Sequence, residues 1–268
     1  TTGYHNVGIG YQALTANTTG ISNVAVGSHA LDANTTANDN TAIGYQALTT
    51  NTTGASNTAV GRSALNNNTT ASNNTALGYY ALVTNTTGYR NVALGSLTLD
   101  ANTTGKYNIA IGHAALTTAT TPDMNTAIGY KSLTHATTGA NCVAVGSLTL
   151  EYLTTGVNHT AIGRDALQKV TTINNLTAVG FKALKENTSG DANTALGYTA
   201  LENNTTGTNN TAVGYQSLTT NITGYQNTGV GDRALANNTS NNNTAVGTFA
   251  LQFSTTASNN TAVGLNSG

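Results

Sequence analysis

The sequence predicts an all-β fold: a parallel β-roll (β-solenoid) of about 16 stacked 17-residue coils. A glycine recurs at every seventeenth position from Gly10 to Gly231 and then, after a step one position shorter, at Gly247 and Gly264. The residue before this repeat glycine is always aliphatic, and the fourth residue after it is Leu in all 15 copies long enough to show it. Because so short a copy cannot bury a core alone, each copy is expected to be one coil of a stacked array.

The first element of each coil is a short strand that ends at the repeat glycine. Residues 40–43 read Asn-Thr-Ala-Ile, which places the β-branched residues on one face and Ala42 on the other. The aliphatic column before the glycine and the Leu column after it are predicted to form the core. The Ala face is small and apolar in nearly every coil, so it is predicted to be covered too, as in a parallel sheet buried on both faces.

The rest of each coil is predicted to be a short second strand, as over residues 46–48, and a closing turn. Residues 51–54 read Asn-Thr-Thr-Gly, and this pattern recurs along the chain. Asn and Thr side chains bond the local backbone, and Gly accepts a positive φ. Sixteen coils spaced by about 4.8 Å give a rod of roughly 75 Å. No helix is expected, because Gly, Asn and Thr interrupt every apolar stripe.

Composition excludes several classes of function. Charged residues make up 7% of the chain and the net charge is −1, which argues against nucleic acid and anionic membranes as partners. No apolar run reaches the length of about 18 residues that membrane insertion requires. The single cysteine, Cys142, excludes an internal disulfide framework. No cofactor is expected.

The ends and the thin core indicate a larger assembly. Neither end shows a start methionine, a signal peptide or a capping repeat, so residues 1–268 are expected to be one repetitive segment of a longer fibre. One Leu and one aliphatic residue per coil is a small core against the entropy of ordering the chain. The small residues of the Ala face would let three sheets approach closely, so a homotrimer is predicted.

The repeat resembles the head repeats of trimeric autotransporter adhesins, which carry an Asn-Ser-Val-Ala-Ile-Gly type run in each coil. Residues 107–112, Tyr-Asn-Ile-Ala-Ile-Gly, are similar to that run, and the resemblance extends over the whole chain. Residues 210–218, Asn-Thr-Ala-Val-Gly-Tyr-Gln-Ser-Leu, also resemble repeat arrays of phage tail-fibre-like proteins. The resemblance implies a left-handed, trimeric roll, extracellular on a cell surface or virion. Adhesin coils are shorter than the coils of this chain, which leaves the coil cross-section open.

Two groups of residues are candidate binding sites. Asparagine stands four residues before the repeat glycine in 13 of 16 copies, and three consecutive copies lose it. The turn asparagine is lost in the same region. This change predicts a drier seam or, alternatively, an apolar patch for a partner; one Cys and one His are too few for a metal site unless a threefold axis triples them. The residues concerned are Cys142, His159 and Leu176 in the first column and Leu153 and Val170 in the second.

The position after the repeat glycine is variable and often aromatic, which predicts an exposed row. Such a row could stack on sugar rings or, alternatively, cover the backbone of the next coil. Its tyrosines are Tyr11, Tyr45, Tyr79, Tyr130, Tyr198 and Tyr215. The Asn-Thr-Thr turns also match the N-glycosylation pattern, although turn chemistry explains them without sugar.

No catalytic constellation emerges, so the chain is not expected to be an enzyme. Asp165 and Asp232 share a column but lie four coils apart, a separation of roughly 19 Å at one strand spacing per coil. The sequence therefore predicts a rigid spacer and attachment segment of an extracellular fibre, with a cell-surface glycan or protein as its receptor. The alternatives are an ice-binding β-solenoid, disfavoured because Val92 and Ile109 interrupt the Thr column, and a glycan-binding or self-assembling filament protein.

Overall fold

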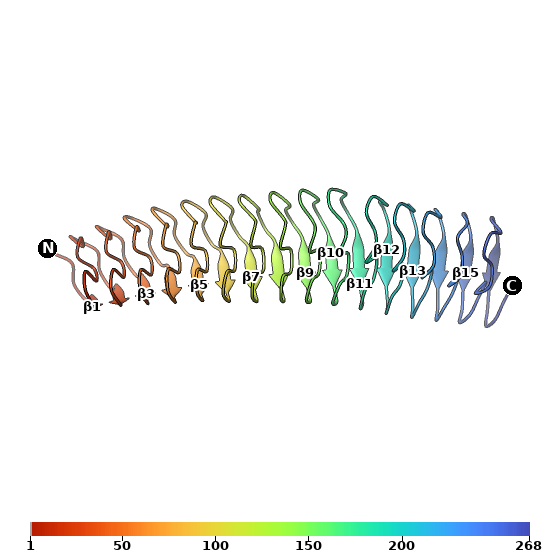
Figure 1. Ribbon diagram of the computed structural model, residues 1–268, viewed down its shortest axis with the longest axis horizontal. Helices are drawn as coiled ribbons and strands as arrows, with labels where there is room; N and C mark the ends of the chain where they lie inside the picture. The colour runs from red at the N-terminus through yellow and green to blue at the C-terminus, as the bar shows by residue number, and fades with distance from the viewer. Residues whose placement is uncertain (1) are drawn as a thin grey trace. The chain divides into compact units, whose positions relative to one another are not determined.

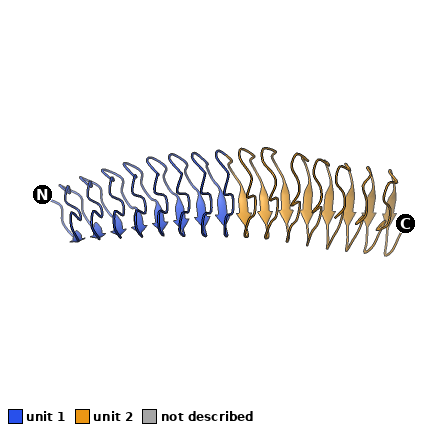
Figure 2. Ribbon diagram, in the orientation of Figure 1, with its two compact units in different colours: residues 1–138 blue, residues 139–268 orange. Residues whose placement is uncertain are grey.

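The computed structural model describes residues 2–268 and contains sixteen three-residue strands, one for each copy of the repeat (Figure 1). No helix occurs among these residues. The chain divides into two compact units, residues 1–138 and 139–268, which Figure 2 colours separately. The first unit contains β1 (Val7–Ile9), β2 (Val24–Val26), β3 (Thr41–Ile43), β4 (Thr58–Val60), β5 (Thr75–Leu77), β6 (Val92–Leu94), β7 (Ile109–Ile111) and β8 (Thr126–Ile128). The second contains β9 (Val143–Val145), β10 (Thr160–Ile162), β11 (Thr177–Val179), β12 (Thr194–Leu196), β13 (Thr211–Val213), β14 (Thr228–Val230), β15 (Thr244–Val246) and β16 (Thr261–Val263).

Within each unit the strands pair in parallel and in sequence order. Ala42 of β3 pairs with Ala25 of β2 and with Ala59 of β4, so the register advances by one repeat per strand. Between β14 and β15 the step is one position shorter, and Thr228 pairs with Thr244. The predicted parallel β-solenoid, with one copy of the repeat in each coil, is confirmed. Its left-handed sense stays a prediction, as does a single repetitive segment over residues 1–268.

The repeat glycine is required by both its conformation and its surroundings. Gly44 has a φ of 134°, and a Cβ built on it would lie 2.6 Å from the carbonyl oxygen of Gly61 in the next coil. An L side chain therefore meets backbone that cannot move without breaking the ladder, in which the Gly44 N–H donates to the Val26 carbonyl at 2.8 Å. The glycine period thus sets where each strand ends.

The predicted second strand over residues 46–48 is wrong, because this segment is a turn. Gln46 and Leu48 have φ values of 57° and 54°, in the left-handed region that strands do not use. Their backbone N–H groups still bond to neighbouring coils, from Gln46 to the Ser28 carbonyl at 3.0 Å and from Leu48 to the Ala64 carbonyl at 2.9 Å. This corner segment is therefore hydrogen-bonded to both neighbouring coils, although its backbone is not in the extended conformation of a strand.

The core is made by Leu and Ala, and not by the aliphatic column before the glycine. Ala42, Ala47 and Leu48 are fully buried, whereas Ile43 is 40% exposed and Leu77, its equivalent in β5, is 49% exposed. Predicting that column as core was wrong for a geometric reason: successive strand residues point to opposite faces, so an inward Ala42 turns its two neighbours outward.

The Ala face is covered by leucines of the same chain and needs no partner chain. Gly229 stands in the Ala column, and a Cβ built on it would lie 3.4 Å from Cγ of Leu218, in the preceding corner. The small Ala side chain therefore leaves room for the larger Leu within one narrow coil. The Ala face is covered as predicted, but by the same chain and not by a trimer contact.

Two columns of buried asparagine complete the interior. The Asn40 Nδ2 donates to the Gly54 carbonyl at 2.9 Å, and its Oδ1 accepts from the backbone N–H of Asn57 at 2.9 Å. From the turn column, the Asn51 Nδ2 donates to the same Gly54 carbonyl at 2.8 Å and to the Asn34 Oδ1 at 3.2 Å. Each amide thus joins consecutive coils, which satisfies buried polar groups that would otherwise be costly.

Candidate functional site

The five residues of the predicted apolar patch are inside the second unit. Cys142, Leu153, Val170 and Leu176 are fully buried, and His159 is 1% exposed. A patch for a partner requires accessible side chains. Their burial argues against that reading and favours the drier seam.

His159 takes over the hydrogen bonds of the asparagine that it replaces. Its Nε2 lies 2.8 Å from the Ile173 carbonyl, and the backbone N–H of Leu176 donates to its Nδ1 at 3.3 Å. Asn40 serves the equivalent carbonyl and N–H in its own coil. The pattern requires a neutral ring with its proton on Nε2. Burial lowers the pKa of His159 to about 4, which keeps the ring neutral at physiological pH.

Cys142 replaces the asparagine of the preceding coil with a weaker partner. Its Sγ lies 3.8 Å from the Gly156 carbonyl, the position that the equivalent asparagines reach with Nδ2. Burial raises the pKa of the Cys142 thiol to about 11, so the group stays protonated and unreactive at neutral pH. The thiol is thus a small, poorly reactive core group.

The predicted row of tyrosines is exposed. The exposed fractions run from 43% at Tyr215 to 70% at Tyr11. Several ring faces, however, lie against neighbours in the row. The rings of Tyr198 and Tyr215 stack at 5.2 Å with 9° between their planes, and Phe181 stacks on Tyr198 at the same distance.

At one position of the row a cation stands in place of an aromatic residue. The Arg62 guanidinium lies 5.7 Å from the ring centroid of Tyr45 and 5.9 Å from that of Tyr79. Ring edges and hydroxyl groups, more than ring faces, are therefore what this row offers to a ligand. Such edges suit hydrogen bonding better than the face-on stacking of sugars.

A surface that sequence reasoning missed is the outer face of the strands. In every coil the first and third strand residues point away from the Ala-filled interior, and the third is always Ile, Val or Leu. Of these, Ile9, Ile43 and Leu77 in the first unit and Ile162, Leu196, Val246 and Val263 in the second are exposed. We call this the outer strand face. The Ala column could have located this face. Ala side chains are small enough to fit inside a narrow coil, and an inward Ala leaves the two neighbouring strand residues pointing outward.

A cluster of aromatic and cationic side chains was also missed. Two turn columns hold mainly small polar residues, but two consecutive coils of the first unit carry Tyr89-Arg90 and Lys106-Tyr107. The Arg90 Nη1 donates to the Tyr107 hydroxyl at 2.8 Å, and its guanidinium lies 5.5 Å from the Tyr107 ring centroid. The Lys106 ammonium lies 5.8 Å from the Tyr89 centroid. The sequence feature that could have located this cluster is a pair of aromatic and cationic residues at the same two positions of consecutive repeats, Tyr89-Arg90 and Lys106-Tyr107.

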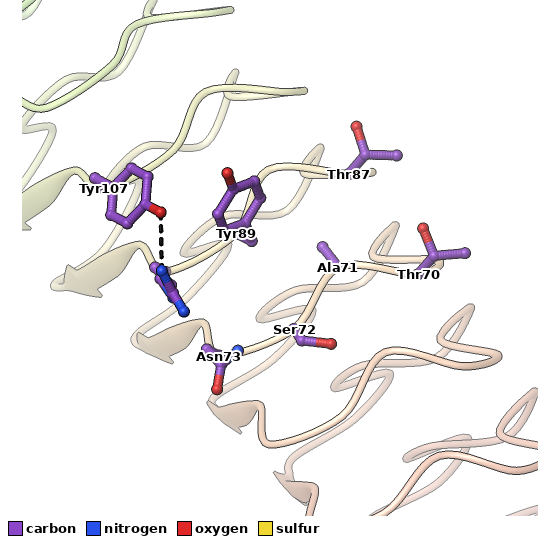
Figure 3. A pocket seen from close by; sticks show the side chains of 8 residues that line it. Thr70, Ala71, Ser72, Asn73, Thr87, Tyr89 and Tyr107 are labelled. Atoms are coloured by element: carbon purple, nitrogen blue, oxygen red, sulfur yellow. Dashed lines mark hydrogen bonds between the residues drawn. The ribbon is translucent and has the colours of Figure 1, made fainter.

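This cluster borders a surface pocket of about 450 Å³, whose side chains come from consecutive coils (Figure 3). Its other walls are small and mostly polar. Hydrogen bonds from the Tyr89 hydroxyl and the Arg90 guanidinium lower the pKa of the Tyr107 hydroxyl, and the positive charges of Arg90 and Lys106 act in the same direction. The pocket is lined by Thr70, Ala71, Ser72, Asn73, Thr87, Tyr89, Arg90 and Tyr107.

Within residues 2–268, no group of three or more His, Cys, Asp or Glu side chains could hold a metal ion. The part of the chain that is described also has no helix long and apolar enough to cross a membrane. In the Asn-Thr-Thr turns the glycosylation pattern falls on buried amides: the Nδ2 of Asn34 already donates to the Asn17 Oδ1 at 3.0 Å and to the Ala37 carbonyl at 3.1 Å. An oligosaccharide at that atom would break the ladder, so the turn chemistry accounts for these residues.

Comparison with known proteins finds no protein-family model and no curated protein that matches the chain.

Proposed function

We propose that this chain is a rigid spacer and attachment segment of an extracellular fibre, on a cell surface or a virion, that works by mechanics and not by catalysis. The support is the ladder itself. Backbone groups on the strand, at the corner and in the turn bond to equivalent groups one repeat away, and two asparagine columns add side-chain bonds. A segment tied at so many points resists local opening, and with it extension and proteolysis.

The exposed outer strand face is the single observation that supports an oligomeric form of the protein. Side chains such as Ile43 and Leu77 are exposed in the single chain, and their column recurs at every strand. A surface column of aliphatic side chains of this kind marks an interaction site. A second copy presents the same residues at the same repeat, so the two apolar columns match along their length. We propose a homotrimer closed through the outer strand face, the threefold order following from the resemblance to adhesin heads.

Light scattering on the purified chain tests this proposal. The expected mass is three times 27.1 kDa. The double variant Ile43→Glu and Leu77→Glu puts two charges into the apolar column and is expected to shift the mass toward one chain. Thr53→Glu, at an exposed turn position, serves as the control and leaves the mass unchanged. A single-chain mass for the unmodified protein would contradict the assembly.

One specific observation favours ice binding as a second candidate function. The first strand residue is Thr in β3, β4 and β5, in direct register and on the same outer strand face. Val92 and Ile109 interrupt the rank in β6 and β7. Measuring thermal hysteresis on the purified chain separates the two functions, because only an ice-binding surface depresses the freezing point without an equal change in the melting point.

A further inference from the structure

We infer that the pocket beside Arg90 binds a sugar that carries one carboxylate group. The inference deepens the proposed attachment role, and it rests on that role for its biological meaning, although binding to the pocket can be measured on its own. The pocket combines a guanidinium group with neutral hydroxyl and amide groups, which are the partners of a carboxylate and of sugar hydroxyls (Figure 3).

Arg90 supplies the charge that recognises the carboxylate. Its guanidinium is held by the Tyr107 hydroxyl, to which Nη1 donates, and lies 6.0 Å from the Tyr89 ring centroid. Within residues 2–268, Arg90 lies in none of the five ion pairs. The group is therefore oriented by its neighbours while N–H donors remain for a planar, bidentate anion.

Neutral polar groups on the neighbouring coil supply partners for sugar hydroxyls. The Ser72 Oγ accepts a hydrogen bond from the backbone N–H of Ala55 at 3.0 Å, which leaves its own O–H to donate. Asn73, with an exposed amide that can donate and accept, lies beside it in the same wall. A hydroxyl-rich ligand can use both directions of hydrogen bonding that these groups offer.

The charge distribution favours a single carboxylate over a polyanion. Arg90 is the only charged residue among those lining the pocket. Lys106 lies on the following coil, where the Oδ1 of Asp123 accepts a hydrogen bond from its backbone N–H at 2.9 Å. The carboxylate of Asp123 thus lies one coil beyond Lys106, where it would repel a highly sulfated chain.

The local backbone also sets this place apart. Arg90 and Tyr107 have φ values of 56° and 59°, in the left-handed region. The same column holds Asn in 7 of the 14 other coils, and Asn tolerates this region better than long or aromatic side chains do. Two large side chains thus stand together where the local conformation favours a small polar one. Departures from local preference of this kind concentrate at functional sites.

Saturation-transfer NMR with methyl glucuronide as the probe tests the inference, because it detects binding to a protein of any assembly size. We expect saturable binding that is roughly tenfold or more tighter than that of methyl glucoside, which lacks only the carboxylate, since a hydrogen bond to a charged group contributes about that factor. Acetate alone is expected to bind more weakly by a similar factor. Equal binding of the glucoside, or of glucose 6-sulfate, would overturn the assignment.

Variants locate the site. Arg90→Gln is expected to weaken methyl glucuronide binding by roughly tenfold or more, and Tyr107→Phe by a few fold, because it releases the guanidinium but keeps the ring. The matched control is Arg62→Gln, which removes an arginine that also lies between two tyrosine rings but lines no part of this pocket. Unchanged binding in Arg90→Gln, with a circular dichroism spectrum like that of the unmodified protein, sinks the inference. Light scattering on the same samples reports the proposed trimer separately.

Discussion

Two stretches of the molecule use different side chains at the position that satisfies a buried backbone N–H and a buried carbonyl. Around Asn40 and Asn57 in the first unit, an amide in every coil accepts from one backbone N–H and donates to one carbonyl. In the second unit three consecutive coils place Cys142, His159 and Leu176 at that position. The strands keep the same parallel register in both, for example between β9 and β10.

The comparison teaches that the backbone ladder does not require asparagine as such. It requires a side chain that satisfies a buried N–H and a buried carbonyl, and the neutral His159 ring does both. What changes is sensitivity: an amide has no charge to gain, whereas imidazole and thiol groups titrate. The second stretch should therefore respond to acid where the first does not, and its thiol should react with thiol reagents only once the chain unfolds.

The largest effect is expected from removing an amide in the first stretch. In Asn57→Ala, the buried N–H of Asn74 loses its acceptor at 3.0 Å, whereas the Ala71 carbonyl loses one of two donors and keeps the Asn68 Nδ2 at 2.9 Å. The local free energy of unfolding should fall by about 3–4 kcal/mol, because an unsatisfied buried N–H costs about 1–3 kcal/mol and the shortened side chain also leaves a cavity. Hydrogen exchange of the neighbouring strand amides measures it. Asn67→Ala, at an exposed position in the same coil, should change it by less than about 0.5 kcal/mol.

Acid should weaken the second stretch through His159. The ring has a pKa of about 4 in the folded protein and about 6.5 when unfolded, so between these values the unfolded chain binds more protons. Stability is complete above pH 6.5 and is lost as the pH falls to 4, by about 3 kcal/mol in total. Urea denaturation at pH 7.5 and pH 4.0 measures the loss.

The same measurement on His159→Asn gives the control, because the acidic residues elsewhere titrate equally in both proteins. The variant should lack this part of the acid sensitivity. An acid response equal to that of the unmodified protein would show that His159 is not the titrating group.

The Cys142 thiol should react slowly in the native protein. Its pKa of about 11, against a usual value near 9, lowers the thiolate population at pH 8 by about 100-fold, and burial hinders access further. Labelling with a thiol reagent should be slow until urea is added. A Thr53→Cys, Cys142→Ala protein, with its thiol at an exposed turn position, should label at an ordinary rate. Equal rates in the two proteins would contradict the buried seam.

The smallest effect is expected when an amide replaces the imidazole of His159. At pH 7.5, His159→Asn should change the free energy of unfolding by less than about 1 kcal/mol, because Asn reaches the same two backbone atoms in the other coils. His159→Ala leaves the Leu176 N–H and the Ile173 carbonyl without their partner and should cost about 2–3 kcal/mol. Similar losses in both variants would mean that the ring acts only by filling space.

Prediction from sequence succeeded where one residue type has one physical use. The repeat glycines located the strand ends, and the Leu column located half of the core. The other half failed at the column of Ile43 and Leu77, because apolar character alone does not tell an inward face from an outward one. The row of Tyr45 and Tyr79 was correctly predicted to be exposed, but its stacking against Arg62 was not predicted.

By itself, the sequence determined a parallel array of short coils, because a 17-residue period whose constant columns are a glycine, a Leu, a small residue and one further aliphatic residue cannot form a core except by stacking. The tertiary structure alone decided which face is inside. Left-handed corners such as Leu48 fold the coil so tightly that only Ala fits on the strand beside the buried Leu, which turns the larger aliphatic strand residues toward the surface.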